Sequence, residues 1–167
     1  ISLHGNTSSF WNRKKSHQAL GYEESYYAED IESEVEENYN GWGYSDRTML
    51  RQTLKVLKSH DEPVLSHTIL LTTHHPYDAV NEMDLDLPFK NTDSLLENYF
   101  NCLYYTDLAV GEFVDGLAEA GILDGSLLII YADHDSGLTE DVYHYMGLSY
   151  NSDDPNCDKV PLIIYDG

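Results

Sequence analysis

Three short segments of this sequence combine histidine with aspartate or arginine, side chains that commonly bind metal ions and phosphate groups. In two of them, His74 and His75 stand together before Pro76, and Asp133 directly precedes His134. Carboxylate oxygen and imidazole nitrogen together suit a divalent cation such as Mn²⁺, Mg²⁺ or Zn²⁺. The sequence therefore predicts a metal site if the fold brings these two segments together.

The third segment lies near the start of the chain, where His4 is followed by Trp11 and Arg13. A guanidinium group offers a planar fork of donors that matches the oxygens of a phosphate or a carboxylate. A tryptophan adds an apolar wall with one N–H donor. This combination is typical of a pocket for a small anion.

Each segment also has an ordinary structural interpretation, and the residues alone leave it open. Asp133 can be a turn residue beside a solvent-facing His134, and one member of a histidine pair often only packs or caps. Arg13 can stack on Trp11 at the surface without binding a ligand. The remaining histidines show no partner pattern and are expected to be structural or surface residues: His17, His60, His67 and His144.

Two apolar runs end at the histidine segments and are predicted to be buried strands. Residues 64–71 lead into the His74 loop, and residues 127–132 lead into Asp133. Between them, residues 94–120 repeat apolar side chains at helical spacing, with Thr92 or Asp93 as the expected cap and Gly121 as the expected end. A strand–helix–strand crossover makes the two strands parallel, so both loops should lie at one edge of the sheet.

The other elements follow from the same patterns and complete an α/β fold. Ser45 begins an amphipathic helix that runs to about Ser59, and residues 160–165 form a further apolar strand. The acidic stretch 16–46 is expected to be a solvated loop or a frayed helix. We expect a mixed or parallel sheet that contains strands 64–71, 127–132 and 160–165, with the 94–120 helix on one face.

Composition excludes several classes of protein. The 167 residues carry 9 Lys and Arg against 30 Asp and Glu, a net charge of −21 that repels nucleic acid and disfavours anionic membrane surfaces. A hydrophobic content of 41% is too high for a disordered acidic tail, and no apolar run approaches the length of a membrane span. Two cysteines, Cys102 and Cys157, have no metal-type spacing; one bridge is open to them, but a free, buried Cys102 is expected.

The two ends of the sequence favour a piece of a longer protein. The chain opens at Ile1 without a methionine or a signal-peptide pattern, and its last apolar strand finishes at the final residues before Gly167. A strand needs a neighbour, and a sequence that ends at such a strand suggests a fragment of a larger domain.

Five motifs taken in order give the sequence a family resemblance: His4-Gly5-Asn6 with Phe10-Trp11-Asn12-Arg13, Trp42–Asp46 (WGYSD), Thr72–Tyr77 (TTHHPY), Tyr131–His134 (YADH) and Lys159–Ile164 (KVPLII). The series resembles the extracellular catalytic domain of lipoteichoic acid synthases, the phosphoglycerol transferases of the sulfatase/alkaline phosphatase superfamily. The resemblance covers nearly the whole chain, 1–167, but only the carboxyl-terminal part of that domain.

The resemblance implies a fold, a reaction and a location. The fold would be an alkaline phosphatase-like sheet flanked by helices, present here as a partial domain. In the family, a threonine takes phosphoglycerol from phosphatidylglycerol and passes it to a growing glycerol-phosphate polymer, with Mn²⁺ or Mg²⁺ as the cofactor. Such proteins are anchored in the membrane of Gram-positive bacteria and work outside the cell.

The resemblance also implies roles for particular residues. Asp133 and His134 match two metal ligands of the family. The residues that match the phosphoglycerol pocket are His4, Trp11, Arg13 and His74. His74 is preferred to His75 because the family's histidine stands two positions before the proline.

Some positions depart from the family pattern. Ala132 replaces the usual glycine before the Asp-His pair, and Asp135 after that pair is only a weak candidate for an extra ligand. The threonine nucleophile and a glutamate ligand belong to the amino-terminal part of the family domain and have no match here. Thr72 and Thr73 lie on the wrong loop to replace the nucleophile, so this chain alone is expected to be inactive and to bind metal weakly.

Two alternatives stay open at this point. The protein could be a sulfatase or phosphodiesterase of the same superfamily that uses water as the acceptor. It could also be a degenerate domain that binds an anionic glycan or a lipid headgroup without catalysis. A threonine nucleophile and a glutamate ligand encoded upstream of Ile1 would favour the transferase.

Overall fold

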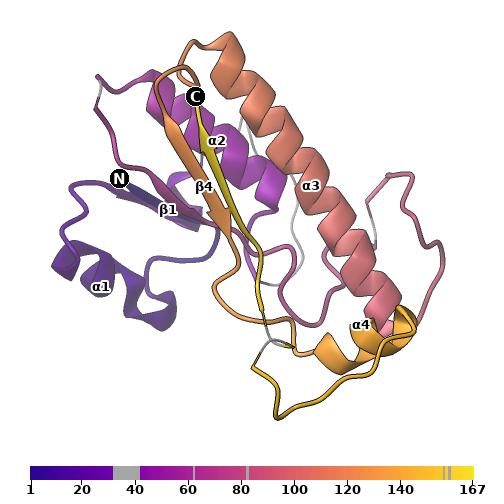
Figure 1. Ribbon diagram of the computed structural model, residues 1–167. Coiled ribbons are helices and arrows are strands. Elements are labelled where there is room, and N and C mark those ends of the chain that lie inside the picture. Colours follow the sequence, from indigo (N-terminus) through magenta and orange to yellow (C-terminus); the bar gives the residue numbers. More distant parts are fainter. Residues whose placement is uncertain (32–41, 62, 82, 156, 158) are drawn as a thin grey trace.

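The computed structural model describes residues 1–31, 42–61, 63–81, 83–155, 157 and 159–167. Within these residues the chain has an α/β fold in which the strands form two hydrogen-bonded sheets (Figure 1). One sheet is parallel, with the order β2-β1-β3, and the other is the antiparallel pair β4-β5. The predicted α/β class is confirmed.

The parallel sheet is built from short strands around β1 (Ser2–His4). On one side β1 pairs with β2 (Ser25–Tyr26), and on the other with β3 (His67–Ile69), where His4 stands opposite Ile69. Leu3 in β1 is fully buried and packs with Met49 and Val56 of the neighbouring helix α2. The burial of Leu3 therefore fixes the strand that carries His4 against a helix.

Two helices support the sheets and agree closely with the sequence pattern. Helix α2 (Asp46–Lys58) begins after Ser45, whose hydroxyl accepts a hydrogen bond from the Thr48 N–H. Helix α3 (Leu95–Glu119) packs beside α2 and is followed by Gly121 at φ +71°, the left-handed position that glycine adopts most easily.

The cap of α3 is Ser94, so the prediction of Thr92 or Asp93 was wrong by one or two positions. Thr92 instead accepts a hydrogen bond from the Ser94 N–H and donates its hydroxyl proton to the Glu97 carboxylate. Several capping residue types stand side by side here, and only the backbone path decides which of them lies at the helix end.

The predicted grouping of the strands into one sheet was wrong. β4 (Leu127–Tyr131) and β5 (Leu162–Asp166) form where strands were expected, but they pair with each other, while β3 pairs with β1. Among the described residues β3 and β4 share no ladder. Apolar periodicity indicates which face of a strand is buried, but it carries no information on which strand lies beside it.

Several short elements had no prediction: β1, β2, α1 (Arg13–Ala19) and α4 (Thr139–Tyr145). They are too short to show a periodic apolar pattern. The acidic stretch 16–46, expected as a loop or frayed helix, includes the end of α1, β2 and a 3₁₀ turn at Ala28–Asp30. Residues 32–41 of that stretch lie outside the described residues.

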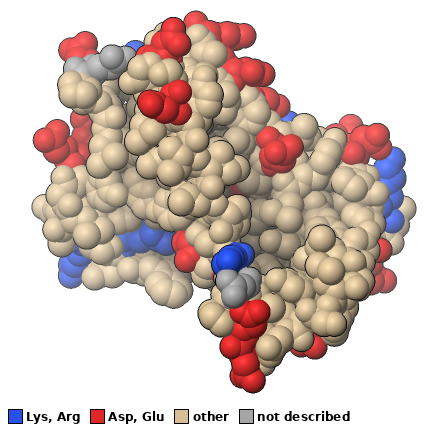
Figure 2. All heavy atoms as spheres, in the orientation of Figure 1, with Lys and Arg blue, Asp and Glu red and all other residues tan. Residues whose placement is uncertain are grey.

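The surface and the cysteines agree with the composition. Figure 2 shows acidic groups spread over the visible face, while one of the few basic areas lies over α1, which carries Arg13, Lys14 and Lys15. None of the described helices is long and apolar enough to cross a membrane. Both cysteines are free, and burial raises the pKa of the Cys102 thiol to about 12, so the expected free, buried Cys102 is confirmed.

Candidate active site at the strand ends

The two histidine loops are in contact, although their strands belong to different sheets and do not form the shared sheet edge that the crossover predicted. β3 ends shortly before His74, and β4 ends two residues before Asp133. The Tyr77 hydroxyl, from the first loop, donates a hydrogen bond to the carbonyl of Ser136 in the second. Tyr77 is 2% exposed and packs in a core cluster with Leu138, so this link between the loops is largely shielded from solvent.

Arg13 connects the amino-terminal segment to this region. As the first residue of α1 it lies close enough to Asp133 for the carboxylate to raise the pKa of the guanidinium, which offsets part of the lowering by burial. Its charge also lowers the pKa of His4. The Arg13 Nε is buried and has no hydrogen-bond partner among the described residues. The guanidinium therefore has an unused donor near the Asp133 loop, as an anion site requires.

His4 is the last residue of β1, and its side chain has no exposed surface. Neither ring nitrogen has a hydrogen-bond partner of ordinary geometry among the described residues, although an interaction with the Ile69 backbone offsets part of the lowering of its pKa. Burial, and then the charge of Arg13, lower its pKa to about 4, so the ring is neutral at pH 7. A buried polar group without a partner is uncommon and calls for an explanation such as a ligand, an ion or a water molecule.

His74 is exposed on a tight turn. Its N–H donates to the Leu71 carbonyl at 2.9 Å, and its ring Nδ1 lies 2.7 Å from the carbonyl oxygen of His75. A proton on Nδ1 would be donated to that carbonyl, which leaves the Nε2 lone pair available to a ligand.

An aromatic contact joins His74 to the amino-terminal segment. The Trp42 ring lies 4.5 Å from the His74 ring, centroid to centroid, and is also 5.6 Å from Phe10, which meets it edge-on. Sequence reasoning did not select Trp42 for the site; its only signal was its place in the WGYSD motif.

Trp11 lies at the rim of the region. It is 77% exposed and has a φ of +51°, and the next residue, Asn12, has a φ of +56°. Left-handed backbone costs free energy for residues other than glycine and is enriched at functional sites. The two residues turn the chain just before Arg13 begins α1.

Asp133 and His134 present an oxygen and a nitrogen to the same space. The Asp133 Oδ1 lies 3.7 Å from the His134 Nε2, and both side chains are exposed. The His134 Nδ1 lies 2.5 Å from the Asp135 carbonyl; a proton held there leaves Nε2 as the free donor atom for a metal. This donor set fits Mn²⁺ or Mg²⁺ in kind. Within the described ranges, however, no three His, Cys, Asp or Glu side chains gather as a metal site would need, and Asp135 completes no such group.

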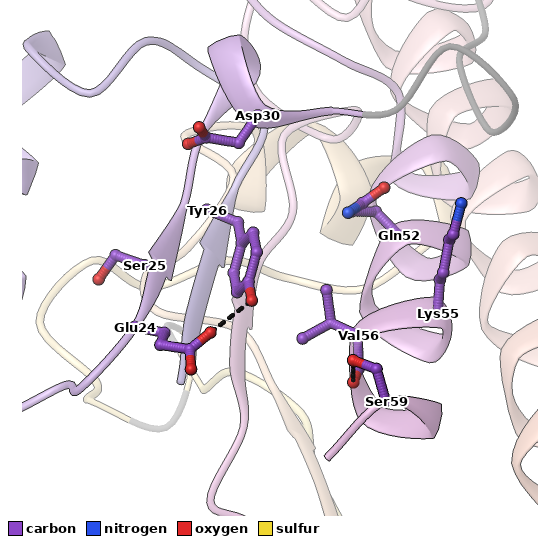
Figure 3. Close-up of a pocket in the computed structure, with 8 residues that line it drawn as sticks. All are labelled: Glu24, Ser25, Tyr26, Asp30, Gln52, Lys55, Val56 and Ser59. Atoms are coloured by element: carbon purple, nitrogen blue, oxygen red, sulfur yellow. Dashed lines mark hydrogen bonds between the residues drawn. The ribbon is translucent and has the colours of Figure 1, made fainter.

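A separate cavity of about 600 Å³ lies between β2 and α2 (Figure 3). It contains none of the predicted site residues, and a hydrogen bond from the Tyr26 hydroxyl to Glu24 crosses part of it. Its lining is mixed and includes two carboxylates, and among the described residues that line it Lys55 is the one cationic side chain. Size alone therefore does not mark the site, and the predicted site residues lie outside this cavity.

Comparison with known proteins identifies the family to which this chain is similar. The family model described as Sulfatase matches residues 2–167. Lipoteichoic acid synthase 2 of Bacillus subtilis (strain 168) is 30% identical over 98% of this chain, and lipoteichoic acid synthase 1 of the same strain is 34% identical over 83%. These matches cover 26% and 21% of the two relatives, so the chain spans about a quarter of their length.

Solved structures agree with the fold. The crystal structure of the lipoteichoic acid synthase LtaP from Listeria monocytogenes is similar over 98% of this chain and 42% of its own, with a TM-score of 0.81 and 25% identity. The phosphoglycerol transferase GacH of Streptococcus pyogenes, solved with sn-glycerol-1-phosphate, is similar over 99% of this chain and 42% of its own, with a TM-score of 0.67 and 19% identity. The second similarity concerns the fold alone.

Proposed function

This chain belongs to the sulfatase family, among the lipoteichoic acid synthase-like members of the alkaline phosphatase superfamily, and we propose that it is part of a phosphoglycerol transferase. The whole enzyme would move glycerol phosphate from phosphatidylglycerol to a growing glycerol-phosphate polymer. It would be anchored in the membrane, with this domain outside the cell. The similarity to two lipoteichoic acid synthases supports the assignment to a transferase of this kind.

The observation that carries the proposal is the convergence of three distant segments. Phe10 of the amino-terminal segment packs on Trp42, which lies against His74, and the Tyr77–Ser136 hydrogen bond holds the His74 and Asp133 loops together. The Asp133 carboxylate also raises the pKa of Arg13 against the lowering by burial. A cationic donor beside a carboxylate–imidazole pair is an arrangement that can bind a phosphate next to a divalent cation. The ordinary structural interpretations of each segment do not require the three to meet.

The pocket residues have separable roles in the proposal. Arg13 binds the phosphate through its guanidinium, whose Nε donor is unused, and Trp11 provides an apolar wall beside the glycerol carbons. The exposed His74 offers its Nε2 to a glycerol hydroxyl. His4, neutral and without a partner, would hydrogen-bond a ligand oxygen or an ordered water at the floor of the pocket.

Asp133 and His134 would hold Mn²⁺ or Mg²⁺ as two of its ligands. When bound, the cation would neutralise phosphate charge and activate the attacking hydroxyl group. Two protein ligands leave most of the coordination shell unfilled, so we propose that other ligands and the threonine nucleophile come from outside this chain. The 167-residue chain by itself is then expected to be inactive.

The surface of β4 and β5 supports a further part of the same catalytic domain. One face of the pair carries five large apolar side chains that are each 48–63% exposed: Leu127, Ile129, Tyr131, Leu162 and Ile164. The other face includes the half-exposed Ile163 and Tyr165. Strands that are apolar on both faces are typical of the interior of a sheet covered on both sides. The pair lies at the front of Figure 1, where the surface in Figure 2 has few charged groups.

A transfer assay with the intact protein tests the proposed function. Vesicles containing phosphatidylglycerol and Mn²⁺ would be used to measure diacylglycerol release and polymer-bound glycerol phosphate. We expect Arg13→Ala to lose about 1.5–3 kcal/mol of transition-state binding, or about 10- to 150-fold in kcat/KM, because a charged hydrogen bond is lost. Lys14→Ala is the matched control, since Lys14 is the next basic residue and is exposed.

Three results would contradict the proposal in different ways. Equal activity of Arg13→Ala and wild type would remove the phosphate role of Arg13. Release of free glycerol phosphate without polymer growth would show a hydrolase. Binding of glycerol phosphate by an intact protein that turns over no substrate would show a degenerate binding domain.

A further inference from the structure

The WGYSD segment, Trp42–Asp46, makes contacts that its place in a loop before α2 does not explain. Asp46 is fully buried. Its Oδ1 accepts hydrogen bonds from the N–H groups of Leu71 and Thr72, both at 2.9 Å, and its own N–H donates to the Thr72 hydroxyl at 3.0 Å. Its Oδ2 accepts from the Thr106 hydroxyl of α3 at 2.6 Å. The carboxylate thus fixes the backbone where β3 leads into the His74 turn.

The turn itself transmits this anchoring to His74. Leu71 is hydrogen-bonded at both of its backbone groups. Its N–H donates to Asp46, and its carbonyl accepts the His74 N–H at 2.9 Å, so Leu71 connects Asp46 to His74. Asp46 is also the first residue of α2, where the helix dipole favours a negative charge. Its charge is therefore stabilised without a cationic partner being needed.

The other end of the segment fixes the ring of His74. The centroid of the Trp42 ring lies 4.5 Å from that of His74. The Phe10 ring meets the Trp42 ring edge-on, with 5.6 Å between centroids. Trp42 is 36% exposed and His74 is exposed, so the contact adds little to the core. Phe10 directly precedes Trp11, and the stack therefore joins two parts of the proposed pocket.

The middle of the segment is fixed to the end of β1. The Tyr44 N–H donates to the Gly5 carbonyl at 2.9 Å. A Cβ on Gly43 would lie 2.3 Å from the Gly5 oxygen, so only glycine permits this approach. Gly5 follows His4 directly, which places the same five residues against the His4 strand and the His74 turn.

We propose that the Trp42–Asp46 segment is a positioning device that sets the His74 side chain relative to the His4 and Arg13 side of the pocket. Asp46 positions the backbone of the turn, and Trp42 positions the ring. Neither residue is proposed to touch the substrate. The inference rests on the proposed function, because it assumes that His74 binds the phosphoglycerol group.

The test measures binding of soluble glycerol phosphate, in the presence of Mn²⁺, to the intact protein by calorimetry. We expect Trp42→Leu to bind about tenfold more weakly than wild type, within the range seen for residues coupled by contact. If Trp42 acts through His74, the double variant Trp42→Leu/His74→Ala should bind within about twofold of His74→Ala alone. Tyr145→Leu is the matched control, because Tyr145 is an exposed aromatic that packs on the Phe100 ring at 5.2 Å in a different part of the chain.

The role of Asp46 in holding the backbone of the turn is tested with two variants. Asp46→Asn keeps an oxygen that can accept from Leu71 and Thr72, whereas Asp46→Ala leaves both buried N–H groups without an acceptor. We expect Asp46→Asn to lose less affinity than Asp46→Ala, and equal losses would overturn the backbone role. If Asp46→Ala does not fold, the comparison of the Trp42 and His74 single and double variants still tests the proposal.

The outcomes separate this inference from the proposed function. Wild-type protein that does not bind glycerol phosphate, or His74→Ala that binds as tightly as wild type, would overturn the proposed pocket and the inference with it. Normal binding by Trp42→Leu, or additive losses in the double variant, would overturn the inference alone. Weaker binding by Tyr145→Leu to the same extent as Trp42→Leu would show a general effect on the fold and would also overturn it.

Discussion

The two pocket histidines of this chain differ in their contact with solvent, and this difference separates their contributions to stability. His74, which we propose for the pocket, is exposed, whereas His4 is fully buried with two ring nitrogens that have no hydrogen-bond partner of ordinary geometry among the described residues. A buried polar side chain without partners lowers stability, and it is retained most readily where it serves a ligand. His4 should therefore behave as a residue kept for binding.

His4→Leu is expected to raise the free energy of unfolding at pH 7 by about 1 kcal/mol, because the change removes two buried polar atoms without partners. Chemical denaturation of the intact protein measures this change. The same variant should weaken glycerol-phosphate binding, and a variant that is both less stable and fully active would contradict the assignment.

The pH dependence of stability gives a second measurement on the same variant. The folded state protonates His4 only near pH 4, whereas the unfolded chain does so near pH 6.5. Falling pH between these values therefore favours the unfolded chain, by up to about 3 kcal/mol for this group. The loss of stability from pH 6.5 to 4 should be smaller in His4→Leu than in wild type, with parallel curves above pH 7.5.

At the scale of the helices, the crossing of α2 and α3 determines how firmly the His74 turn is held. Asp46 of α2 bonds to Thr106 of α3, and the two helices pack along one side of the molecule (Figure 1). Gly116 of α3 lies where a Cβ would come within 2.5 Å of the Leu54 side chain of α2. The helices can therefore approach closely because position 116 has no side chain.

Gly116→Val is expected to lower the free energy of unfolding by about 2 kcal/mol relative to Gly111→Val, because overpacking moves the helices apart. Gly111 lies on the same helix and has open space around its Cβ position, so the intrinsic helical preference of valine cancels in the comparison. Thermal or denaturant unfolding of both variants provides the measurement. Equal stabilities would show that Leu54 moves aside without cost.

At the scale of the whole molecule, a net charge of −21 coexists with a large apolar surface on β4 and β5. The charge disfavours association of two copies and contact with an anionic membrane. The solved LtaP chain, which this chain covers to only 42%, is long enough to supply a further layer in the same domain. These facts together favour the rest of the catalytic domain as the cover of that surface.

Ile164→Lys tests this proposal by comparison of two lengths of chain. In the intact protein we expect a loss of at least about 2 kcal/mol of stability, since the residue would lie in an apolar interface. In the 167-residue chain, where Ile164 is 60% exposed, the same change should raise solubility with little effect on stability. Leu65→Lys is the control, because Leu65 is 78% exposed outside this patch. If both variants are equally harmless in the intact protein, the surface faces solvent and the proposal fails.

The sequence alone determined the features that depend on local pattern. Helical periodicity and capping chemistry predicted α2 and α3 to within a few residues, and the apolar runs predicted β4 and β5. The His74 and Asp133 loops do meet, but not for the predicted reason, because β3 and β4 belong to different sheets. The correct inferences use residues that are near one another in the chain.

Only the tertiary structure decided which strands pair, which side chains are buried and what holds His74. β1 pairs Ser2 with His67, and Asp46 bonds to Leu71 and Thr72, contacts between residues far apart in the sequence. The burial of His4 and the stacking of Trp42 on His74 likewise result from packing among distant segments. The local apolar pattern does not identify such partners, because a strand or an aromatic ring has the same packing preferences whichever neighbour lies beside it.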